Sequence, residues 1–327
     1  MLFISGKCSR NCWYCSLSEK RKNKDIIWAN EREIRNTKEL IKEAEESNAK
    51  GAGITGGDPL VVFRRTFKFA KALKKRFGDK FHIHIYLPPN LVDEKKIRKL
   101  DKVIDEVRFH PSFLINPNKE LMEKEIDKIK MASLIFGRKN IGIELPMIPE
   151  KKKDILKFIL RVKDFIGFVN LNEFEISETN DKIVVKKYKL NRDTYTIKYS
   201  LSAGRWLLNK LKKLKLKVHL CTAFTKNCYQ YENRLKLHNI LPYGNKSKDG
   251  TVVYLALYFK DIGDKKKLMS KLKKGFYVDE KRERFLLSMD LAVELIEQGC
   301  KVARVEEHPT FDASVMEFWY LSKRDLE

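Results

Sequence analysis

Residues 2–15 read LFISGKCSRNCWYC, a short apolar run followed by a loop that carries three cysteines. Leu2–Ser5 ends at Gly6, which predicts a buried strand entering a loop. Cys8, Cys12 and Cys15 are three of the six cysteines of the chain. A disulfide framework is typical of small secreted chains, and this chain has 327 residues and no signal peptide pattern. The cysteine loop therefore indicates a metal site of soft thiolates.

Segments typical of strands and helices alternate from this loop onward. Such alternation predicts a parallel sheet with helices outside it, and right-handed crossovers curl that sheet into a barrel. Six predicted strands are fewer than the eight of a closed barrel, so we expect a partial (β/α)6 TIM-like barrel over residues 1–180. The expected strands are Leu2–Ser5, Gly51–Thr55, Phe81–Leu87, Glu106–Phe109, Ile141–Leu145 and Phe168–Ile176. The expected helices are Glu33–Ser47, Val62–Phe77, Asp93–Leu100, Asn118–Ala132 and Lys151–Phe165.

The remainder of the chain has a different composition. We expect residues 181–239 to form a basic extension, strand-like over Lys182–Lys198, helical over Ala203–Lys217 and a short strand at Val218–Cys221. Residues 240–327 predict a small α+β domain. Its expected strands are Val252–Phe259, Lys301–Val305 and Val315–Leu321, and its expected helices are Asp264–Leu272 and Lys281–Gln298.

The spacing of the cysteine loop bears on the kind of metal. Structural zinc sites and iron–sulfur clusters both usually take four protein ligands. No fourth cysteine lies near Cys8, Cys12 and Cys15 in the sequence. Three ligands leave one metal position open, and a substrate or cofactor can bind at such a position.

Two motifs together give a family resemblance over residues 1–180. The C-x3-C-x2-C loop after the first strand, with Tyr14 before its third cysteine, resembles the radical S-adenosylmethionine (SAM) superfamily. Gly56-Gly57-Asp58-Pro59, after the second strand, resembles its glycine-rich SAM motif, which usually has Glu in place of Asp58. The resemblance implies a [4Fe-4S] cluster on Cys8, Cys12 and Cys15. Its open iron would chelate SAM, and one electron would cleave SAM to methionine and a 5′-deoxyadenosyl radical that abstracts hydrogen from a substrate.

The same resemblance implies the residues that bind the cofactor. The backbone of Tyr14 would face the adenine, and Gly56, Gly57 and Asp58 would lie against the methionine part of SAM, where a Cβ atom would block the approach. The order of strands adds Glu144 and Asn172, because ligands bind at the C-terminal ends of parallel strands. The alternative for this last pair is a structural polar ladder inside the barrel.

Catalytic residues are less well defined by the sequence. Cys221, as a reactive thiol, and His110 are the candidates, and a structural role is the alternative for each. Cys221 with Cys228 could also hold a second metal. His82 and His84 share one face of a predicted strand but lack a third ligand in the sequence, so we expect them to be structural.

Longer strings point to one branch of the superfamily. Phe81-His-Ile-His84, Arg108-Phe-His-Pro111 and Asn170-Leu-Asn-Glu173 resemble an archaeal family related to pyruvate formate-lyase activating enzymes. The resemblance names no particular substrate. It implies a small electron donor such as ferredoxin or flavodoxin.

The charge of the chain suggests a class of substrate. Lysine and arginine number 68 against 44 aspartates and glutamates, a net charge of +24. This excess favours a polyanion, with a lysine-rich thermophile surface as the alternative. Six basic residues without an acid between them are the predicted nucleic-acid contacts: Arg205, Lys210, Lys212, Lys213, Lys215 and Lys217.

Three hypotheses for function follow. The first is a radical SAM enzyme that modifies RNA, most plausibly tRNA. The second is a radical SAM enzyme that modifies a protein or peptide, or an activase of the glycyl-radical type. The third is a basic RNA-binding protein with a structural zinc. No apolar run approaches the roughly 18 residues of a membrane span, so we expect a cytoplasmic protein.

Overall fold

The computed structural model describes residues 1–326, apart from the side chain of Asn227. Contacts divide the chain into two compact units. Unit 1 comprises Met1–Ala44 and Ala49–Cys228, and unit 2 comprises Glu45–Asn48 and the chain from Tyr229 onward. Among the described residues, no helix combines the length and the apolar character that a membrane span needs.

Unit 1 is built on one nine-stranded sheet in the order β3-β2-β1-β4-β5-β6-β7-β8-β9. From β1 to β9 every neighbouring pair in this order is parallel. The strands β2 and β3 extend the sheet beyond β1 as an antiparallel hairpin. The bounds are β1 (Leu2–Phe3), β2 (Ile27–Ala29), β3 (Arg32–Ile34), β4 (Gly51–Thr55), β5 (His82–Leu87), β6 (Glu106–Phe109), β7 (Ile141–Met147), β8 (Phe168–Glu173) and β9 (Lys217–Cys221).

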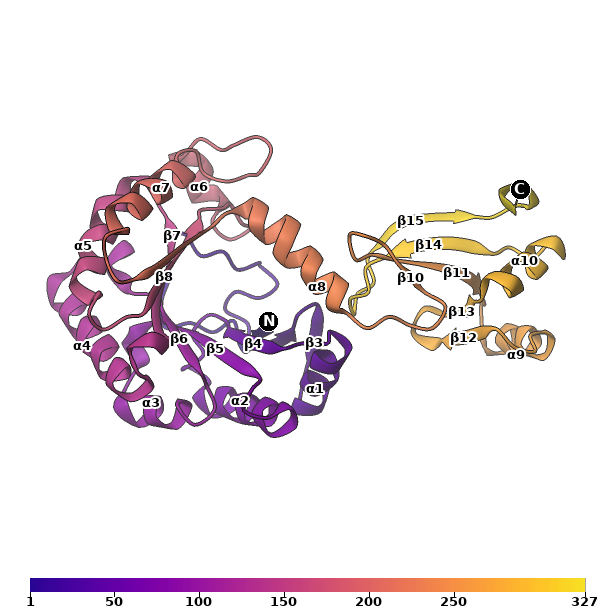
Figure 1. The fold of residues 1–327 in the computed structure, drawn as a ribbon, viewed down its shortest axis with the longest axis horizontal. Helices are drawn as coiled ribbons and strands as arrows, with labels where there is room; N and C mark the ends of the chain where they lie inside the picture. Colours follow the sequence, from indigo (N-terminus) through magenta and orange to yellow (C-terminus); the bar gives the residue numbers. More distant parts are fainter. Residues whose placement is uncertain (327) are drawn as a thin grey trace. The chain divides into compact units, whose positions relative to one another are not determined.

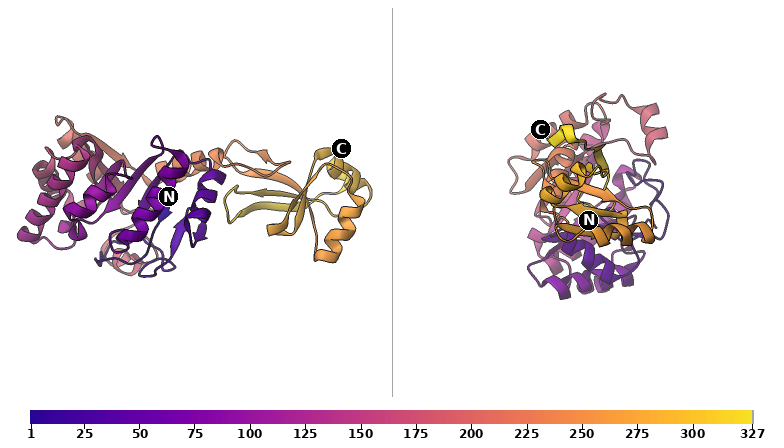
Figure 2. Two further views of the ribbon diagram at one scale, coloured as in Figure 1. Left: turned by 90° about the horizontal axis from the view of Figure 1, so that it is seen from below. Right: turned by 90° about the vertical axis from the view of Figure 1, so that its right-hand side faces the viewer.

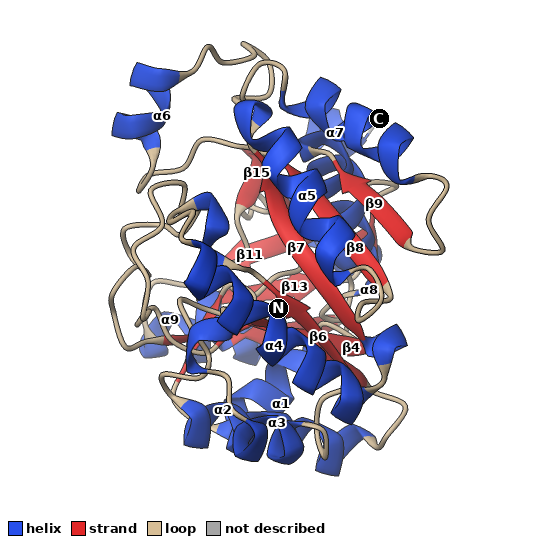
Figure 3. Cartoon of the chain, turned by 90° about the vertical axis from the view of Figure 1, so that its left-hand side faces the viewer, coloured by secondary structure: helices blue, strands red, loops and turns tan. Residues whose placement is uncertain are grey.

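The helices of unit 1 lie outside this sheet, with the strands on the inside of an arc (Figures 1 and 3). Their sequences explain the arrangement, because the buried residues of α5, which are Ile155, Phe158, Ile159 and Val162, recur at helical spacing. The bounds are α1 (Thr37–Glu46), α2 (Phe63–Phe77), α3 (Glu94–Leu100), α4 (Lys119–Phe136), α5 (Lys152–Val162), α6 (Asp181–Lys187) and α7 (Ser200–Leu211).

Alternation within each strand separates two faces of the sheet. In β5 the residues Ile83, Ile85 and Leu87 are fully buried in the core between sheet and helices. His82, His84 and Tyr86 therefore face the inside of the arc, which we call the lumen. The lumen face carries the polar residues of the sheet.

The expected partial (β/α) barrel is confirmed, with differences after residue 180. The strand β9 adds a seventh parallel strand, paired with β8, so residues 181–228 belong to unit 1 instead of a separate extension. The prediction of a strand over Lys182–Lys198 was wrong at its start, where Asp181–Lys187 forms α6 with Val184 fully buried. The β2–β3 hairpin was not predicted, because its strands are only three residues long.

Unit 2 has the α+β character that the sequence predicts for residues 240–327, but it already begins at Tyr229 and includes Glu45–Asn48. Its antiparallel sheet has the order β12-β13-β11-β14-β15, with β10 paired to β11. Figure 2 shows α9 and α10 grouped beside this sheet. The bounds are β10 (Asn245–Lys246), β11 (Val252–Tyr258), β12 (Phe276–Asp279), β13 (Arg284–Leu287), β14 (Ala303–Glu307), β15 (Val315–Tyr320), α8 (Glu232–Leu237), α9 (Ile262–Lys271) and α10 (Met289–Glu297).

The predicted helix Lys281–Gln298 is in fact a strand followed by a shorter helix. Arg284 begins β13 and is almost fully buried, and it donates hydrogen bonds to Asp279 (2.9 Å) and to Glu307 (2.8 and 2.6 Å). This ion network joins β12, β13 and β14, and it reaches across β11, which lies between β13 and β14. A buried arginine of this kind is stable only where its partners are in place, and local sequence periodicity does not reveal those partners.

Candidate active site

A cavity of about 580 Å³ lies at the C-terminal ends of the parallel strands of unit 1. Its wall includes the cysteine loop, which follows β1, the glycines that follow β4, and residues at the ends of β6, β7 and β8. Nine of the residues predicted from the sequence line it together: Cys8, Cys12, Tyr14, Cys15, Gly56, Gly57, His110, Glu144 and Asn172.

The three cysteines fit an iron–sulfur cluster better than a single zinc ion. Around one tetrahedral zinc, thiolate sulfurs lie about 3.8 Å apart, given Zn–S bonds of about 2.3 Å. Among residues 1–326, the sulfur atoms of Cys8, Cys12 and Cys15 do not all lie within 4.8 Å of one another. The described residues contain one group of potential ligand atoms that does meet this spacing, and it lies elsewhere in the chain. In a cubane each thiolate binds its own iron, so the sulfurs lie farther apart.

The surroundings of the thiols oppose the thiolate forms when no cation is bound. Burial, with smaller contributions from the neighbouring Cys8 and Cys15, raises the pKa of Cys12 to about 11. Burial likewise raises the pKa of Cys8. The thiols of Cys8 and Cys12 are therefore protonated at neutral pH without a cation. A bound metal would favour the thiolate forms.

The glycines after β4 hold the cysteine loop in place. The N–H of Gly57 donates to the carbonyl of Ser5 (2.8 Å), and the N–H of Asp58 donates to that of Lys7 (2.9 Å). A Cβ atom on Gly56 would lie 2.5 Å from the oxygen of Ser5, and one on Gly57 would lie 2.4 Å from that of Lys7. These glycines are thus required by the close approach of the loop itself, in addition to any contact with SAM.

Asp58 serves the same loop with its side chain. One carboxylate oxygen accepts from the hydroxyl of Ser9 (2.8 Å), and the other accepts from the N–H of Leu60 (2.9 Å). The side chain is fully buried, which raises its pKa, and it is not part of the cavity wall. A role of the Asp58 side chain in binding SAM therefore stays a prediction.

A segment after β8 supports the cysteine loop from its other side. The hydroxyls of Ser177 and Thr179 donate to the carbonyl of Cys15 (3.1 and 3.0 Å), and that of Thr179 also lies 2.7 Å from the carbonyl of Leu17. The side-chain amide of Asn180 donates to the carbonyl of Tyr14 (3.4 Å). This supporting role was not predicted from the sequence. A polar run directly after a strand was the available signal.

Tyr14, His110 and Glu144 form a hydrogen-bonded chain in the cavity wall. The Tyr14 hydroxyl lies 2.9 Å from Nε2 of His110, whose Nδ1 lies 2.9 Å from the carbonyl of Glu144. A carbonyl only accepts, so Nδ1 carries the hydrogen and Nε2 accepts from Tyr14. Burial, opposed by the bond to Glu144 and reinforced by nearby Arg10, lowers the pKa of His110 to about 4. Both ring nitrogens are therefore engaged within the protein.

Arg10 joins the cysteine loop to the helical layer. Its guanidinium donates to the carbonyl of His110 (2.5 Å) and pairs with the buried carboxylate of Glu125. The other oxygen of Glu125 accepts from the N–H of Ser112 (2.8 Å). The charge of Arg10 is thus balanced by Glu125 and is fixed next to the cysteines.

The lumen below the cavity contains a polar ladder. Glu144 accepts from the side-chain amides of Asn172 (2.9 Å) and Asn170 (3.2 Å). Arg108 reaches the same carboxylate (3.4 Å) and donates to the hydroxyl of Tyr86 (3.1 Å). Glu144 and Asn172 are therefore both ladder members and cavity residues, so the two alternatives drawn from the sequence apply together.

The remaining predicted residues lie elsewhere. Cys221 is buried at the end of β9 and is not among the residues that line the cavity. Within the described part of the chain, Cys221 and Cys228 belong to no group with the spacing of a single-ion site. A catalytic role for Cys221 stays a prediction.

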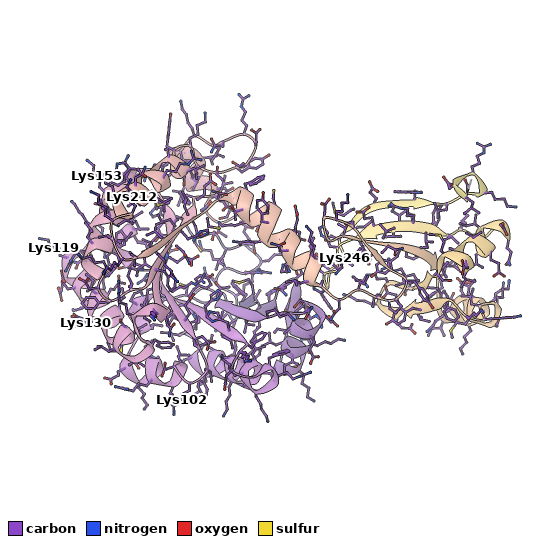
Figure 4. The ribbon with its side chains drawn as sticks, in the orientation of Figure 1. Lys102, Lys119, Lys130, Lys153, Lys212 and Lys246 are labelled. Carbon is purple, nitrogen blue, oxygen red and sulfur yellow. The ribbon has the colours of Figure 1, made fainter. Side chains whose placement is uncertain are left out.

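The predicted nucleic-acid contacts are exposed, but they do not line the cavity. They occupy α7, the turn after it and the first residue of β9, whereas the cavity lies at the other ends of the strands. These residues are Arg205, Lys210, Lys212, Lys213, Lys215 and Lys217. Other exposed lysines of unit 1 lie on the outer rim of its helices (Figure 4). Their charge is therefore spread over the outside of the arc.

Comparison with known proteins agrees with the geometry. Residues 2–113 match the family model described as the radical SAM superfamily. A protein of Methanocaldococcus jannaschii, named "Putative glycyl-radical enzyme activating enzyme", is 36% identical over 276 residues, which are 82% of this chain and 72% of the relative. A solved structure described as "Native anSMEcpe with bound AdoMet and Kp18Cys peptide" aligns with a TM-score of 0.42 and 14% identity, over 77% of this chain and 71% of that chain. The chain therefore belongs to the radical SAM superfamily, in the same family as this archaeal relative.

Proposed function

We propose that this radical SAM enzyme acts on a protein, as an activating enzyme that generates a radical on a glycyl-radical enzyme. The observation that carries the proposal is the 36% identity, over 82% of the chain, with a relative whose name states that activity. The aligned length exceeds the cysteine loop and the SAM motif by far. The alignment therefore covers much more of the two chains than the motifs that the whole superfamily shares.

The cofactors of the superfamily are a [4Fe-4S] cluster and SAM. Cys8, Cys12 and Cys15 would hold the cluster, and Tyr14, Gly56 and Gly57 would line the SAM site. When bound and reduced, these groups supply a 5′-deoxyadenosyl radical that removes a hydrogen atom from the substrate. The protein keeps the three thiols on one loop, fixes that loop through Asp58 and Thr179, and encloses the site at the ends of the strands.

The open sheet supports access by a polypeptide. The sheet ends at β3 and β9, so unit 1 does not close on itself. The cavity wall extends from Gly6, next to β1, to Lys226, beyond β9. Lys226 also pairs with Glu175 of the same wall (2.5 Å). Charged and amide side chains at this position can hydrogen-bond the peptide groups of an entering segment.

An RNA substrate, the first hypothesis from the sequence, has less support. It depends on net charge and on the exposed basic run Arg205–Lys217, which lies at the strand ends opposite the cavity. Comparison with known proteins favours the second hypothesis instead, because the relative is named for action on an enzyme. A ferredoxin or flavodoxin remains the expected electron donor.

The test compares a protein and an RNA as substrates in one assay. The anaerobically reconstituted enzyme receives SAM and reductant, together with a glycyl-radical enzyme of the source organism, its variant with alanine at the radical-bearing glycine, or bulk tRNA. We expect 5′-deoxyadenosine and an organic radical by electron paramagnetic resonance with the glycyl-radical enzyme alone. A rise in 5′-deoxyadenosine with tRNA, and none with the protein, would overturn the proposal.

A further inference from the structure

Three potential metal ligands meet at the end of the lumen opposite the cavity. One ligand atom from each of His82, His84 and Glu106 lies within 4.8 Å of the other two. His82 and Glu106 are the first residues of β5 and β6, so the group sits at the N-terminal ends of the strands. The sequence alone indicates the two histidines but no third ligand. The parallel register supplies it, because His84 is paired with Glu106.

We propose that His82, His84 and Glu106 form a second metal site that binds a divalent transition ion such as Zn²⁺, separate from the cysteine loop. Two imidazoles and one carboxylate are donors that suit Zn²⁺ and its neighbours, and three protein ligands leave room for water in the fourth position. The expected role is structural. The bound ion would tie β5 to β6 beneath the polar ladder.

The geometry of Glu106 favours this use. Its Oε1 accepts from Nε of Arg108 (2.6 Å), while its Oε2 faces Nε2 of His82 at 4.0 Å. One oxygen is thus fixed by the guanidinium, and the other points toward a histidine at a distance that a shared ion would shorten. A hydrogen bond that orients a ligating carboxylate is the usual companion of a metal site.

The second histidine has a comparable partner. Nε2 of His84 lies 3.2 Å from the hydroxyl of Tyr86, which also accepts from Arg108. A metal-binding histidine generally donates its other ring N–H to an acceptor, and the tyrosine oxygen can be that acceptor. The His84 ring also packs closely against Gly53 of β4. A Cβ atom added to Gly53 would lie only 2.5 Å from Nε2 of His84.

Charge and access are both compatible with a cation. Arg108 is the shared cationic partner of Glu106 and Glu144, so these three side chains carry one net negative charge. The side chain of His82 is 53% exposed and that of Glu106 is 20% exposed. An ion can therefore enter from solvent, and a divalent ion would offset the unbalanced carboxylate.

The experiment measures Zn²⁺ bound to the anaerobic, cluster-loaded enzyme. Loading the cysteines with the cluster keeps them from binding zinc. After chelation of loose metal, the protein is equilibrated with micromolar Zn²⁺ and desalted, and zinc and iron are counted by mass spectrometry. The variants are His82→Ala, whose exposed side chain contributes little to the core, and His219→Ala, an exposed histidine of β9, as the matched control.

We expect one equivalent of Zn²⁺ on the unaltered enzyme and on His219→Ala, and at least tenfold weaker binding to His82→Ala, with iron unchanged in all three. Co²⁺ is the second probe, and at this site it should show ligand-field bands without strong thiolate charge transfer. Equal zinc binding by His82→Ala, absence of zinc from the unaltered enzyme, or a thiolate band from Co²⁺ would each overturn the proposal.

Discussion

The hydroxyl of Tyr14 lies 2.9 Å from Nε2 of His110, and this bond joins the cysteine loop to the residue that follows β6. His110 in turn is bonded to the carbonyl of Glu144 on β7. The position of Tyr14, between Cys12 and Cys15, is thereby fixed by β6 and β7 of the parallel sheet. The loop that holds the metal is thus attached to the rigid part of the barrel.

Tyr14→Phe tests this attachment. The change removes the donor to a buried acceptor, and the cost of an unsatisfied buried group is about 1–3 kcal/mol. We expect the free energy of unfolding of the cluster-free protein to fall by about that amount in urea titrations. Tyr195→Phe, at a side chain that is 66% exposed, is the control and should change little. Equal stability of the two variants would show that the bond contributes nothing.

The buried His110 predicts a pH dependence. Its pKa is about 4 in the folded protein against 6.5 for the free side chain. Between these values the unfolded chain binds a proton and the folded chain does not, so the free energy of unfolding falls as the pH drops from 6.5 to 4. At about 1.4 kcal/mol per pH unit the loss is on the order of 3 kcal/mol.

Urea titrations of the cluster-free protein across pH 4–7 measure this loss. The slope with pH should be smaller in His110→Gln than in the unaltered protein. It should be unchanged in His219→Gln, which alters an exposed histidine. A slope in His110→Gln as steep as in the unaltered protein would assign the pH dependence to other groups.

Gly57→Ala tests the close packing of the glycines after β4 against the cysteine loop. The added Cβ would lie 2.4 Å from the carbonyl oxygen of Lys7 and 2.7 Å from that of Gly6, both of them backbone atoms that cannot move without shifting the loop. We expect at least a several-fold drop in iron and sulfide per protein after reconstitution. Gly263→Ala is the control, since its Cβ would meet only the Asp261 side chain at 3.2 Å. Full iron content in Gly57→Ala would show that this close packing is not required to hold the cluster.

Thr179→Val probes the segment that supports the loop from the other side. Valine keeps the shape of the side chain but removes the donor to the carbonyls of Cys15 and Leu17. We expect about 1 kcal/mol lower stability and faster loss of the cluster to a chelator. Thr194→Val removes a hydroxyl in the loop before α7 and serves as the comparison. Identical rates of cluster loss in the two variants would show that the Thr179 hydroxyl does not stabilise the cysteine loop.

The sequence predicted the features that depend on neighbouring residues. The spacing of Cys8, Cys12 and Cys15 and the pair Gly56-Gly57 are local patterns, and the alternation of apolar runs predicts the parallel sheet. Glu106 could not be recognised as a partner of His82 and His84, because only the register of β5 and β6 brings them together. Thr179 was missed for a similar reason, since its partner Cys15 lies 164 residues away.

The charge pattern alone does not distinguish between two uses of a basic helix. The basic run Arg205–Lys217 suggested RNA, yet Arg205 and Lys210 lie on the exposed side of α7, whose Leu207 and Leu211 are fully buried in the barrel core. The other lysines of the run follow in the turn after α7 and at the start of β9. An amphipathic surface helix and a polyanion-binding helix share this pattern in sequence. The location of the run relative to the cavity separates them, and location requires the fold.

Reductive cleavage of SAM by the reconstituted enzyme, compared with Cys12→Ala under strict anaerobiosis, is the measurement that decides whether Cys8, Cys12 and Cys15 hold a cluster that cleaves SAM. Cys12 lies in the cavity wall with the other two cysteines, and two ligands would not hold the cluster. We expect 5′-deoxyadenosine and broad cluster absorbance from the unaltered enzyme, and neither from Cys12→Ala. Full absorbance and full cleavage in Cys12→Ala would contradict this expectation.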